Sequence, residues 1–157
     1  MPAPKSVIKM NKDGIQYVSE VDKCQYYIHE LTRAALRDVG KFISRTFRNS
    51  FYAHFKRHTG RAGKATKYKV WSSKSTTAPR VEIGLKADNL TGFYAYFQEL
   101  GTDSTPRLGL LKKAAQDNID EIIKIESQYL SALNGDETRA SGLIDEKDYE
   151  GSADGQN

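Results

Sequence analysis

The sequence predicts an α+β fold, in which a small antiparallel sheet packs against a long N-terminal helix and a C-terminal helix. Three observations lead to this prediction. Apolar residues recur every three or four positions through residues 19–55, alternating apolar and polar runs follow in 66–86, and a second helical period occupies 107–133. The 157 residues have the length of one domain, so we expect residues 1–134 to form a single domain.

The sequence allows an N-terminal β-hairpin over residues 5–18. Two short apolar stretches flank Asp13-Gly14. An Asp-Gly step between such stretches is a hairpin-turn signal, because both residues tolerate positive φ angles.

The longest predicted element is a helix from about Ser19 to Phe55. We expect Ser19 to be its N-cap and Asp22 to place a carboxylate in its first turn. The helix should end before Thr59-Gly60, since glycine permits a left-handed stop. Cys24, the single cysteine, should be buried in the apolar stripe. That stripe consists of Val21, Cys24, Ile28, Leu31, Ala35, Val39, Phe42 and Thr46.

A loop and a second hairpin should follow this helix. Residues 59–65, TGRAGKA, contain glycines but lack the spacing of a phosphate-binding loop. Two alternating runs then predict strands joined by the turn-rich link SSKSTTAP, with a polar tip near Lys74–Thr77. In the first strand Tyr68, Val70 and Ser72 alternate with Lys67, Lys69 and Trp71, and in the second Val81, Ile83 and Leu85 alternate with Arg80, Glu82 and Gly84.

A single helix is predicted after Pro106, and Asn134-Gly135 should end it. Its apolar positions are Leu108, Leu111, Ala115, Ile119, Ile122, Ile123 and Leu130, with Glu126 in the same period. Residues 135–157 are acidic and rich in Gly, Ser and Asp. Because they hold little apolar surface, we expect them to form a flexible acidic tail.

The charge of the chain is divided unevenly. Residues 1–113 hold 21 Lys/Arg and 9 Asp/Glu, whereas residues 114–157 hold 3 and 11. A block as basic as residues 33–80 suggests an anionic partner, either nucleic acid or an acidic protein surface, although a solvated face explains it equally well. The long helix carries a basic stripe with which a free nucleic-acid-binding protein could contact phosphates: Arg33, Arg37, Lys41, Arg45 and Arg48.

The sequence holds no defensible catalytic set. It lacks the motifs of nucleophile-elbow hydrolases, zinc proteases and dinucleotide-binding enzymes. His54 and His58 are four apart and could share a metal, but no Cys or carboxylate close in sequence completes a ligand set. We therefore predict a protein that is not an enzyme and that uses no cofactor or metal.

The apolar runs, the N-terminus and the cysteine content of the sequence predict the cellular setting. No apolar run reaches the roughly 18 residues that span a bilayer, so we expect no membrane partner. The N-terminus lacks the apolar core of a secretory signal. One cysteine excludes an intramolecular disulfide and fits synthesis in a reducing cytoplasm.

The segment FYAYFQELGT, residues 93–102, concentrates aromatic rings beside one carboxylate. We expect some of these rings to anchor the sheet to the helices. Glu99 should accept hydrogen bonds from backbone N–H groups or from a basic side chain, because a buried carboxylate needs such partners. Gly101 permits a tight or left-handed turn, and Thr102 can hydrogen-bond within it. The segment therefore predicts a structural corner.

The order of elements and this segment together resemble the small tail-completion, or head–tail joining, proteins of tailed bacteriophages. Members carry Thr-Gly after the first long helix, matched here by Thr59 and Gly60. They also carry a Tyr-Ala-x-x-x-Glu-x-Gly-Thr segment, matched by Tyr94, Ala95, Glu99, Gly101 and Thr102. The resemblance covers about residues 19–133 and leaves out the N-terminal hairpin and the acidic tail. It departs at HTGRAGK, which is more basic and glycine-rich than the family pattern.

The resemblance implies a structural virion protein that forms a ring at the neck or at the head-proximal end of the tail. Its partners would be further copies of itself and other neck, connector or tail-tube proteins. It would be made in the bacterial cytoplasm and would remain in the virion. Genomic DNA could pass a basic inner surface, for which the candidate residues are Arg61, Lys64, Lys67, Lys69 and Lys74.

Overall fold

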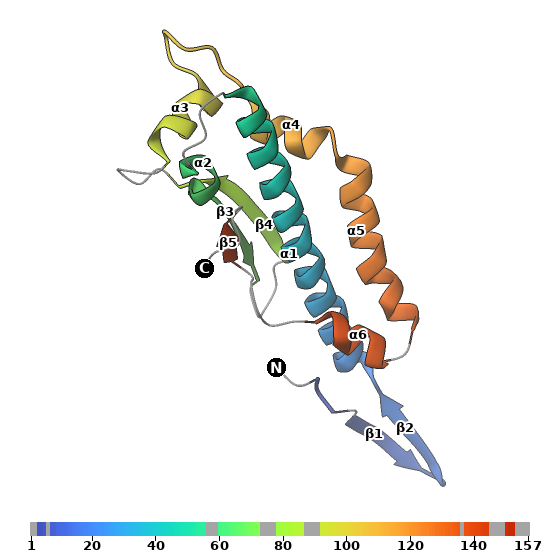
Figure 1. Cartoon of the computed structure of the whole chain (residues 1–157). Coiled ribbons are helices and arrows are strands. Elements are labelled where there is room, and N and C mark those ends of the chain that lie inside the picture. Colours follow the sequence, from blue (N-terminus) through green and yellow to red (C-terminus); the bar gives the residue numbers. More distant parts are fainter. Residues whose placement is uncertain are drawn as a thin grey trace.

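The α+β class is confirmed by a computed structural model, which describes residues 3–5, 7–55, 60–72, 78–86, 92–135, 137–144 and 150–152. A long helix, α1 (Val21–His54), lies at the centre of the molecule (Figure 1). A small antiparallel sheet packs on one side of α1, and the C-terminal helices pack on the other. The sheet and the C-terminal helices are therefore separated by α1.

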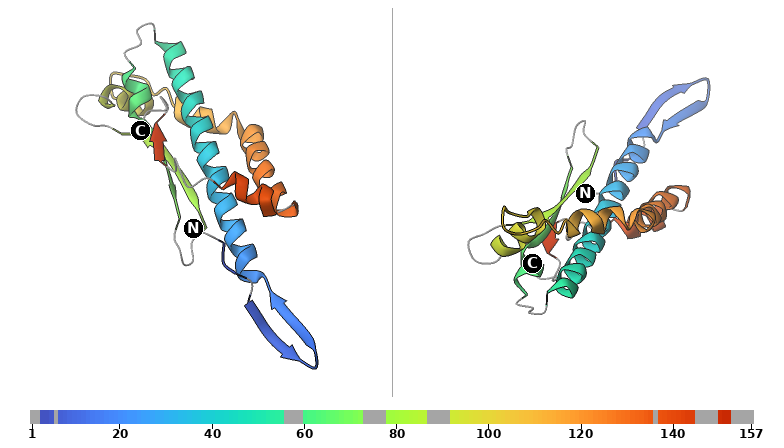
Figure 2. Two further views of the ribbon diagram at one scale, coloured as in Figure 1. Left: turned by 60° about the horizontal axis from the view of Figure 1, so that its bottom comes forward. Right: turned by 90° about the horizontal axis from the view of Figure 1, so that it is seen from above.

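The predicted N-terminal hairpin is confirmed. Strands β1 (Val7–Lys12) and β2 (Ile15–Ser19) pair antiparallel, and Asp13 and Gly14 between them have φ angles of 54° and 80°. Both turn residues thus adopt the positive φ that the Asp-Gly step predicts. The hairpin projects beyond the start of α1, away from the rest of the molecule (Figure 2).

Helix α1 matches its predicted length, but its exposed and buried parts differ from the prediction. Its N-cap is Glu20, and Ser19 is instead the last residue of β2. Asp22 lies in the first turn, as expected. Leu31, Ala35 and Val39 of the predicted stripe are buried and Phe42 and Thr46 are half-buried, whereas its first three members Val21, Cys24 and Ile28 are exposed.

The sheet has the order β4-β3-β5. Strands β3 (Thr66–Trp71) and β4 (Arg80–Leu85) form the predicted hairpin, with Tyr68 opposite Ile83. Tyr68 and Val70 are buried, whereas Lys67 and Trp71 are exposed, so the predicted alternation of β3 is confirmed. The hairpin tip at 74–77 lies outside the described residues.

A short helix, α2 (Arg61–Ala65), replaces part of the loop that was predicted at 59–65. Gly60 precedes it with a φ of 72°. Ala62, Gly63 and Ala65 are buried, because their small side chains let the helix lie close to its neighbours.

The helix predicted after Pro106 is two helices, α4 (Leu110–Gln116) and α5 (Ile119–Ser131), followed by the 3-10 turn η1 (Ala132–Asn134). The break lies at Asp117–Asn118, where the Asn118 side-chain amide donates to the carbonyl of Ala114 at 2.9 Å. Such side-chain bonds favour a helix end. The break changes the inward face, so the predicted core positions Ile119, Ile123 and Leu130 are exposed and Tyr129 is buried.

The C-terminal region differs from the predicted flexible tail where the structure describes it. Helix α6 (Glu137–Leu143) packs Ala140 into a buried cluster with Leu31 and Ala34 of α1. Strand β5 (Glu150–Ser152) pairs antiparallel with β3. The few apolar residues of this region are therefore placed where they cover α1, which composition alone does not reveal.

A second buried cluster joins the two sides of α1 near its C-terminal end. Phe47 and Phe51 lie at its centre, with Ala62 of α2, Ala95 of helix α3 (Phe93–Leu100) and Ala114 of α4 around them. No helix within the described parts of the chain combines the length and apolar character that crossing a bilayer requires.

Candidate interaction site

The buried side of α3 is organised by Glu99. Its carboxylate oxygens accept hydrogen bonds from the backbone N–H groups of Leu110 at 2.8 Å and Leu111 at 2.9 Å. These amides open helix α4, whose N-terminus favours a negative charge. The backbone of α3 also bonds to this connection, since the carbonyl of Glu99 accepts a hydrogen bond from the N–H of Gly109 at 3.2 Å. The expectation that Glu99 binds backbone N–H groups is confirmed.

The Gly101-Thr102 step turns the chain between α3 and α4. Gly101 has a φ of 79° and a ψ of 166°, a combination that is essentially restricted to glycine. A Cβ at this position would lie 2.9 Å from the backbone N of Arg107. Thr102 and Thr105 exchange backbone hydrogen bonds of 2.9 and 3.2 Å. The predicted structural corner is therefore present, and both residues help to form it.

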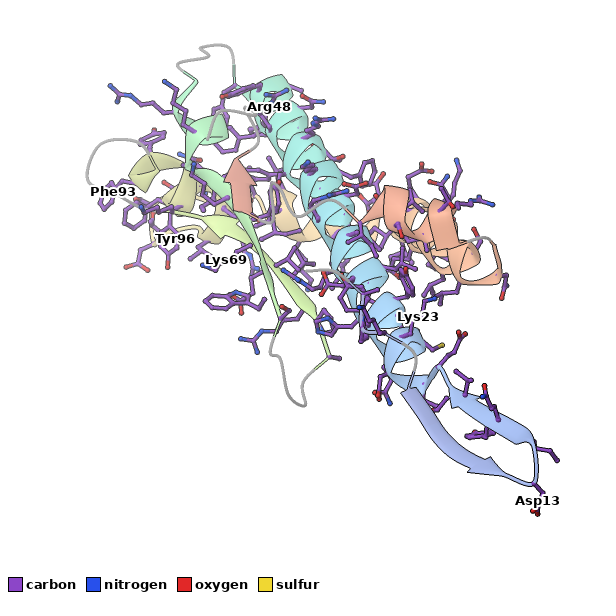
Figure 3. All side chains as sticks on the ribbon, turned by 90° about the horizontal axis from the view of Figure 1, so that it is seen from below. Asp13, Lys23, Arg48, Lys69, Phe93 and Tyr96 are labelled. Carbon is purple, nitrogen blue, oxygen red and sulfur yellow. The ribbon has the colours of Figure 1, made fainter. Side chains whose placement is uncertain are left out.

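The aromatic rings of this segment do not anchor the sheet as expected. Of the motif residues on α3, only Ala95 and Glu99 point inward, whereas Phe93, Tyr94 and Tyr96 are exposed. Phe97 is half-buried, and its ring meets Phe93 edge-to-face at 4.5 Å. The expectation was wrong because Ala95 and Glu99 fill the short inner face of this eight-residue helix. Phe93, Tyr94, Tyr96 and Leu100 form an exposed surface that we name the α3 aromatic face (Figure 3).

The predicted basic residues lie on α2 and β3. Arg61 and Lys64 are exposed on α2, Lys67 is exposed on β3, and Lys69 is half-buried beside it. Lys74 and Thr59 lie outside the described residues.

Trp71 belongs to the same side of the sheet as Lys67 and Lys69. The Lys69 ammonium lies 4.5 Å from the centroid of the Trp71 ring. The indole N–H donates to Glu82 at 2.7 Å, and Glu82 also pairs with Arg80 at 3.2 Å. The Trp71 ring therefore lies between a cation, Lys69, and a carboxylate, Glu82, that are both supplied by the chain itself.

The basic stripe predicted on α1 is not a solvent-exposed row. Arg37 is buried, and its Nε donates to Asp38 at 3.0 Å while its Nη2 donates to the Tyr129 hydroxyl at 3.3 Å. Arg33 donates to both carboxylate oxygens of Glu30. These arginines have intramolecular partners, so the stripe cannot present five equivalent cations to phosphates.

Tyr129 and Asp38 are the interacting pair that sequence reasoning missed. The Tyr129 hydroxyl donates to the Asp38 carboxylate and so joins α5 to α1. Burial raises the pKa of Tyr129 to about 12, and the negative charge and hydrogen bond of Asp38 add to the effect. The feature of the sequence that could have indicated this pair is Asp38, because it is the single acid within residues 33–80.

Cys24 was predicted to be buried but is exposed. It lines an open cavity of about 230 Å³ between the start of α1 and the η1–α6 segment, together with Tyr27, Ala132 and Ala140. No three His, Cys, Asp or Glu residues gather in a metal-binding group within the described ranges. His58, half of the histidine pair considered above, lies outside them.

Comparisons with protein-family models, with curated proteins and with solved structures find no match to this chain. The likeness to phage tail-completion proteins therefore depends on the residues of this sequence alone.

Proposed function

We propose that the protein is a structural virion protein of a tailed bacteriophage. It forms a ring at the neck or at the head-proximal end of the tail and is needed for tail completion or head–tail joining. The proposal rests on the motif that Tyr94, Ala95, Glu99, Gly101 and Thr102 share with that family.

The arrangement of this motif is the observation that best supports the proposal. Glu99 and Gly101 hold α3 against the start of α4, and this support leaves the α3 aromatic face exposed. Exposed apolar surfaces larger than a few hundred Å² usually mark interaction sites. A rigidly held, exposed aromatic helix suits a subunit whose work is contact with neighbours.

The mechanism of the proposed function is assembly rather than catalysis. A closed ring needs two different, complementary surfaces on each subunit. The basic residues of α2 and β3 can face DNA in the channel or an acidic neighbour, while acidic side chains such as Asp120 and Glu121 are exposed on α5. Opposite charges of this kind orient subunits as they meet.

The test is deletion of the gene from the parent phage or prophage, followed by negative-stain electron microscopy of the lysate. DNA-filled heads beside unattached or length-abnormal tails are expected, and plasmid-borne wild-type protein should restore infectious particles. Infectious particles of normal shape without the protein would overturn the proposal.

A free nucleic-acid-binding protein is the second candidate. The observation in its favour is the outward side of β3, where Lys67 and Lys69 flank Trp71. Lysines that follow phosphates beside an aromatic ring are typical of single-strand binding. The predicted stripe on α1 no longer supports it, because Arg33 and Arg37 bind acidic and hydroxyl partners within the chain.

A salt titration tests the second candidate. Single-stranded DNA binding should weaken with a log–log slope of about −0.7 per phosphate contacted. The variant Lys67→Ala/Lys69→Ala should make this slope shallower, whereas Lys124→Ala on α5 should leave it unchanged. Absence of binding at low salt would remove the second candidate.

A further inference from the structure

The N-terminal hairpin has no role in the function proposed above, yet it exposes apolar side chains. Ile15 is 73% exposed and Tyr17 59% exposed on one face of β2, and Val18 is exposed on the opposite face. Among the residues that the structure describes, β1 and β2 form a two-stranded sheet of their own. An isolated two-stranded hairpin is marginally stable in water, so contact with another surface would stabilise it.

The exposed apolar surface continues from the hairpin onto α1. Val21 and Ile28 belong to the stripe whose members Leu31, Ala35 and Val39 are buried, but both are exposed in the first two turns. The start of the stripe is thus left partly uncovered within the described chain. We name Ile15, Tyr17, Val21 and Ile28 the arm surface.

The α3 aromatic face is the second exposed apolar surface and lies at the opposite end of the molecule. Figure 3 shows Phe93 and Tyr96 remote from Asp13 at the hairpin tip. Helix α1 has 34 residues, a length of about 50 Å, and it runs between the two ends. The arm surface and the α3 aromatic face of one chain therefore cannot meet.

The two surfaces match in size. Tyr94 is 71% exposed and Phe93 59% exposed, values close to those of Ile15 and Tyr17. From these fractions each surface offers on the order of 400–500 Å² of apolar area, about half of what each partner buries in a standard interface. Asp13 at the arm tip and Arg107 beside α3 are both exposed and opposite in charge.

We propose that the arm surface of one chain docks on the α3 aromatic face of a second copy. The interface is heterologous, since two different surfaces meet, and its repetition leads to a closed ring or a filament. It deepens the proposed function, on which it rests, by naming the surfaces through which ring neighbours bind.

The test uses full-length protein in sedimentation velocity from about 10 μM to about 1 mM, a range that reveals even weak self-association. The arm variant is Ile15→Asp/Tyr17→Asp, and the face variant is Tyr94→Asp/Tyr96→Asp. The matched control is Ile123→Asp, because Ile123 is an exposed aliphatic residue on α5, outside both surfaces. Wild type and control should associate, and each variant alone should remain monomeric.

The decisive sample is the equimolar mixture of the two variants. The intact arm of the face variant can dock on the intact α3 of the arm variant, so a 1:1 dimer should form with no larger species. Association of the face variant alone at wild-type strength would indicate arm-to-arm pairing and overturn the proposal. A mixture that stays monomeric would overturn it as well.

The thiol of Cys24 supplies a second measurement, because it is exposed and lies on α1 between Val21 and Ile28. Its alkylation rate should fall several-fold as wild-type protein associates and should stay constant in the arm variant. Should the double substitution prevent folding, judged by circular dichroism, Tyr17→Ser replaces it, with the same loss of association expected.

The outcomes separate this interface from the proposed function. Wild-type protein that remains monomeric at about 1 mM overturns the interface, even where deletion of the gene disrupts the neck. Concentration-dependent association together with normal particles from the deletion strain overturns the virion role and leaves the interface standing.

Discussion

The carboxylate of Glu99 in α3 accepts the N–H of Leu110, the first residue of α4, at 2.8 Å. Its second oxygen accepts the next N–H of the same helix. One buried side chain therefore satisfies two amides that a helix start leaves without partners.

Two substitutions of Glu99 should destabilise the fold to different extents. Glu99→Gln keeps one acceptor and loses the charge, which should cost about 1 kcal/mol in the free energy of unfolding. Glu99→Ala leaves two amides unsatisfied and should cost about 2–4 kcal/mol. Urea unfolding measures both. Asp103→Ala, at an exposed site in the same connection, is the control and should change little. Equal stability of Glu99→Ala and wild type would contradict the role of Glu99.

Gly101→Ala should destabilise the protein more than Gly109→Ala. Both glycines have positive φ, 79° and 60°, so both substitutions introduce strain of about 1 kcal/mol or more. At Gly101 the new Cβ also lies 2.9 Å from a backbone nitrogen, whereas at Gly109 the nearest atom is a side-chain nitrogen at 3.8 Å. Thermal unfolding should therefore show the larger fall in Tm for Gly101→Ala. The reverse order would exclude the close approach of Arg107.

Tyr129 should make the protein less stable as pH rises from about 10 to 12. Its pKa is raised from 10.0 to about 12 in the folded state, so the folded protein keeps a proton that the unfolded chain loses. The contribution of Tyr129 to the free energy of unfolding is complete below pH 10 and decreases above it, by up to roughly 2–3 kcal/mol. Tyr129→Phe removes this contribution and also loses the hydrogen bond to Asp38.

The check is the difference between wild type and Tyr129→Phe in urea unfolding at a series of pH values, since this difference isolates the contribution of the Tyr129 hydroxyl. The excess in the free energy of unfolding of wild type over Tyr129→Phe should decrease steadily from about pH 10 to about pH 12. A difference that is constant from pH 8 to 12 would contradict the raised pKa.

Gly40→Ala should destabilise the protein although alanine favours helices by about 1 kcal/mol. The added Cβ would lie 2.9 Å from Cδ2 of the buried Tyr68 ring, and overpacking of this kind costs about 1–3 kcal/mol. Without the ring the two closest contacts are gone and only the Cβ of residue 68 remains near, at 3.2 Å, so the helical preference should prevail. Gly40→Ala should therefore stabilise a Tyr68→Ala background, and a double-mutant cycle by urea unfolding measures the change of sign.

The predictions that succeeded depend on residues close together in sequence. The Asp13-Gly14 turn, the alternation about Tyr68 and the length of α1 follow from backbone preferences and from the spacing of apolar residues. The need of Glu99 for donors, either backbone N–H groups or a basic side chain, followed from what a buried carboxylate requires.

The predictions that failed concern which surface another element covers. Val21 and Cys24 continue the stripe of Leu31 but are exposed, and the η1–α6 segment beside Cys24 leaves an open cavity instead of a packed contact. Some rings of residues 93–102 were expected to anchor the sheet to the helices, but Ala95 and Glu99 occupy the inner face of α3. Arg37 was counted among surface cations, although Asp38 and Tyr129 bind it.

The sequence by itself determined the two hairpins, the length of α1, the turn at Asp13-Gly14 and the requirement of Glu99 for donors, because these depend on local geometry and chemistry. Only the tertiary structure decided that Tyr129 meets Asp38 and that the predicted C-terminal helix is divided into α4 and α5. It also decided that apolar surfaces stay exposed at both ends of the molecule. The reason is that burial depends on which distant segments pack together, and the period of one helix cannot specify where its neighbours end.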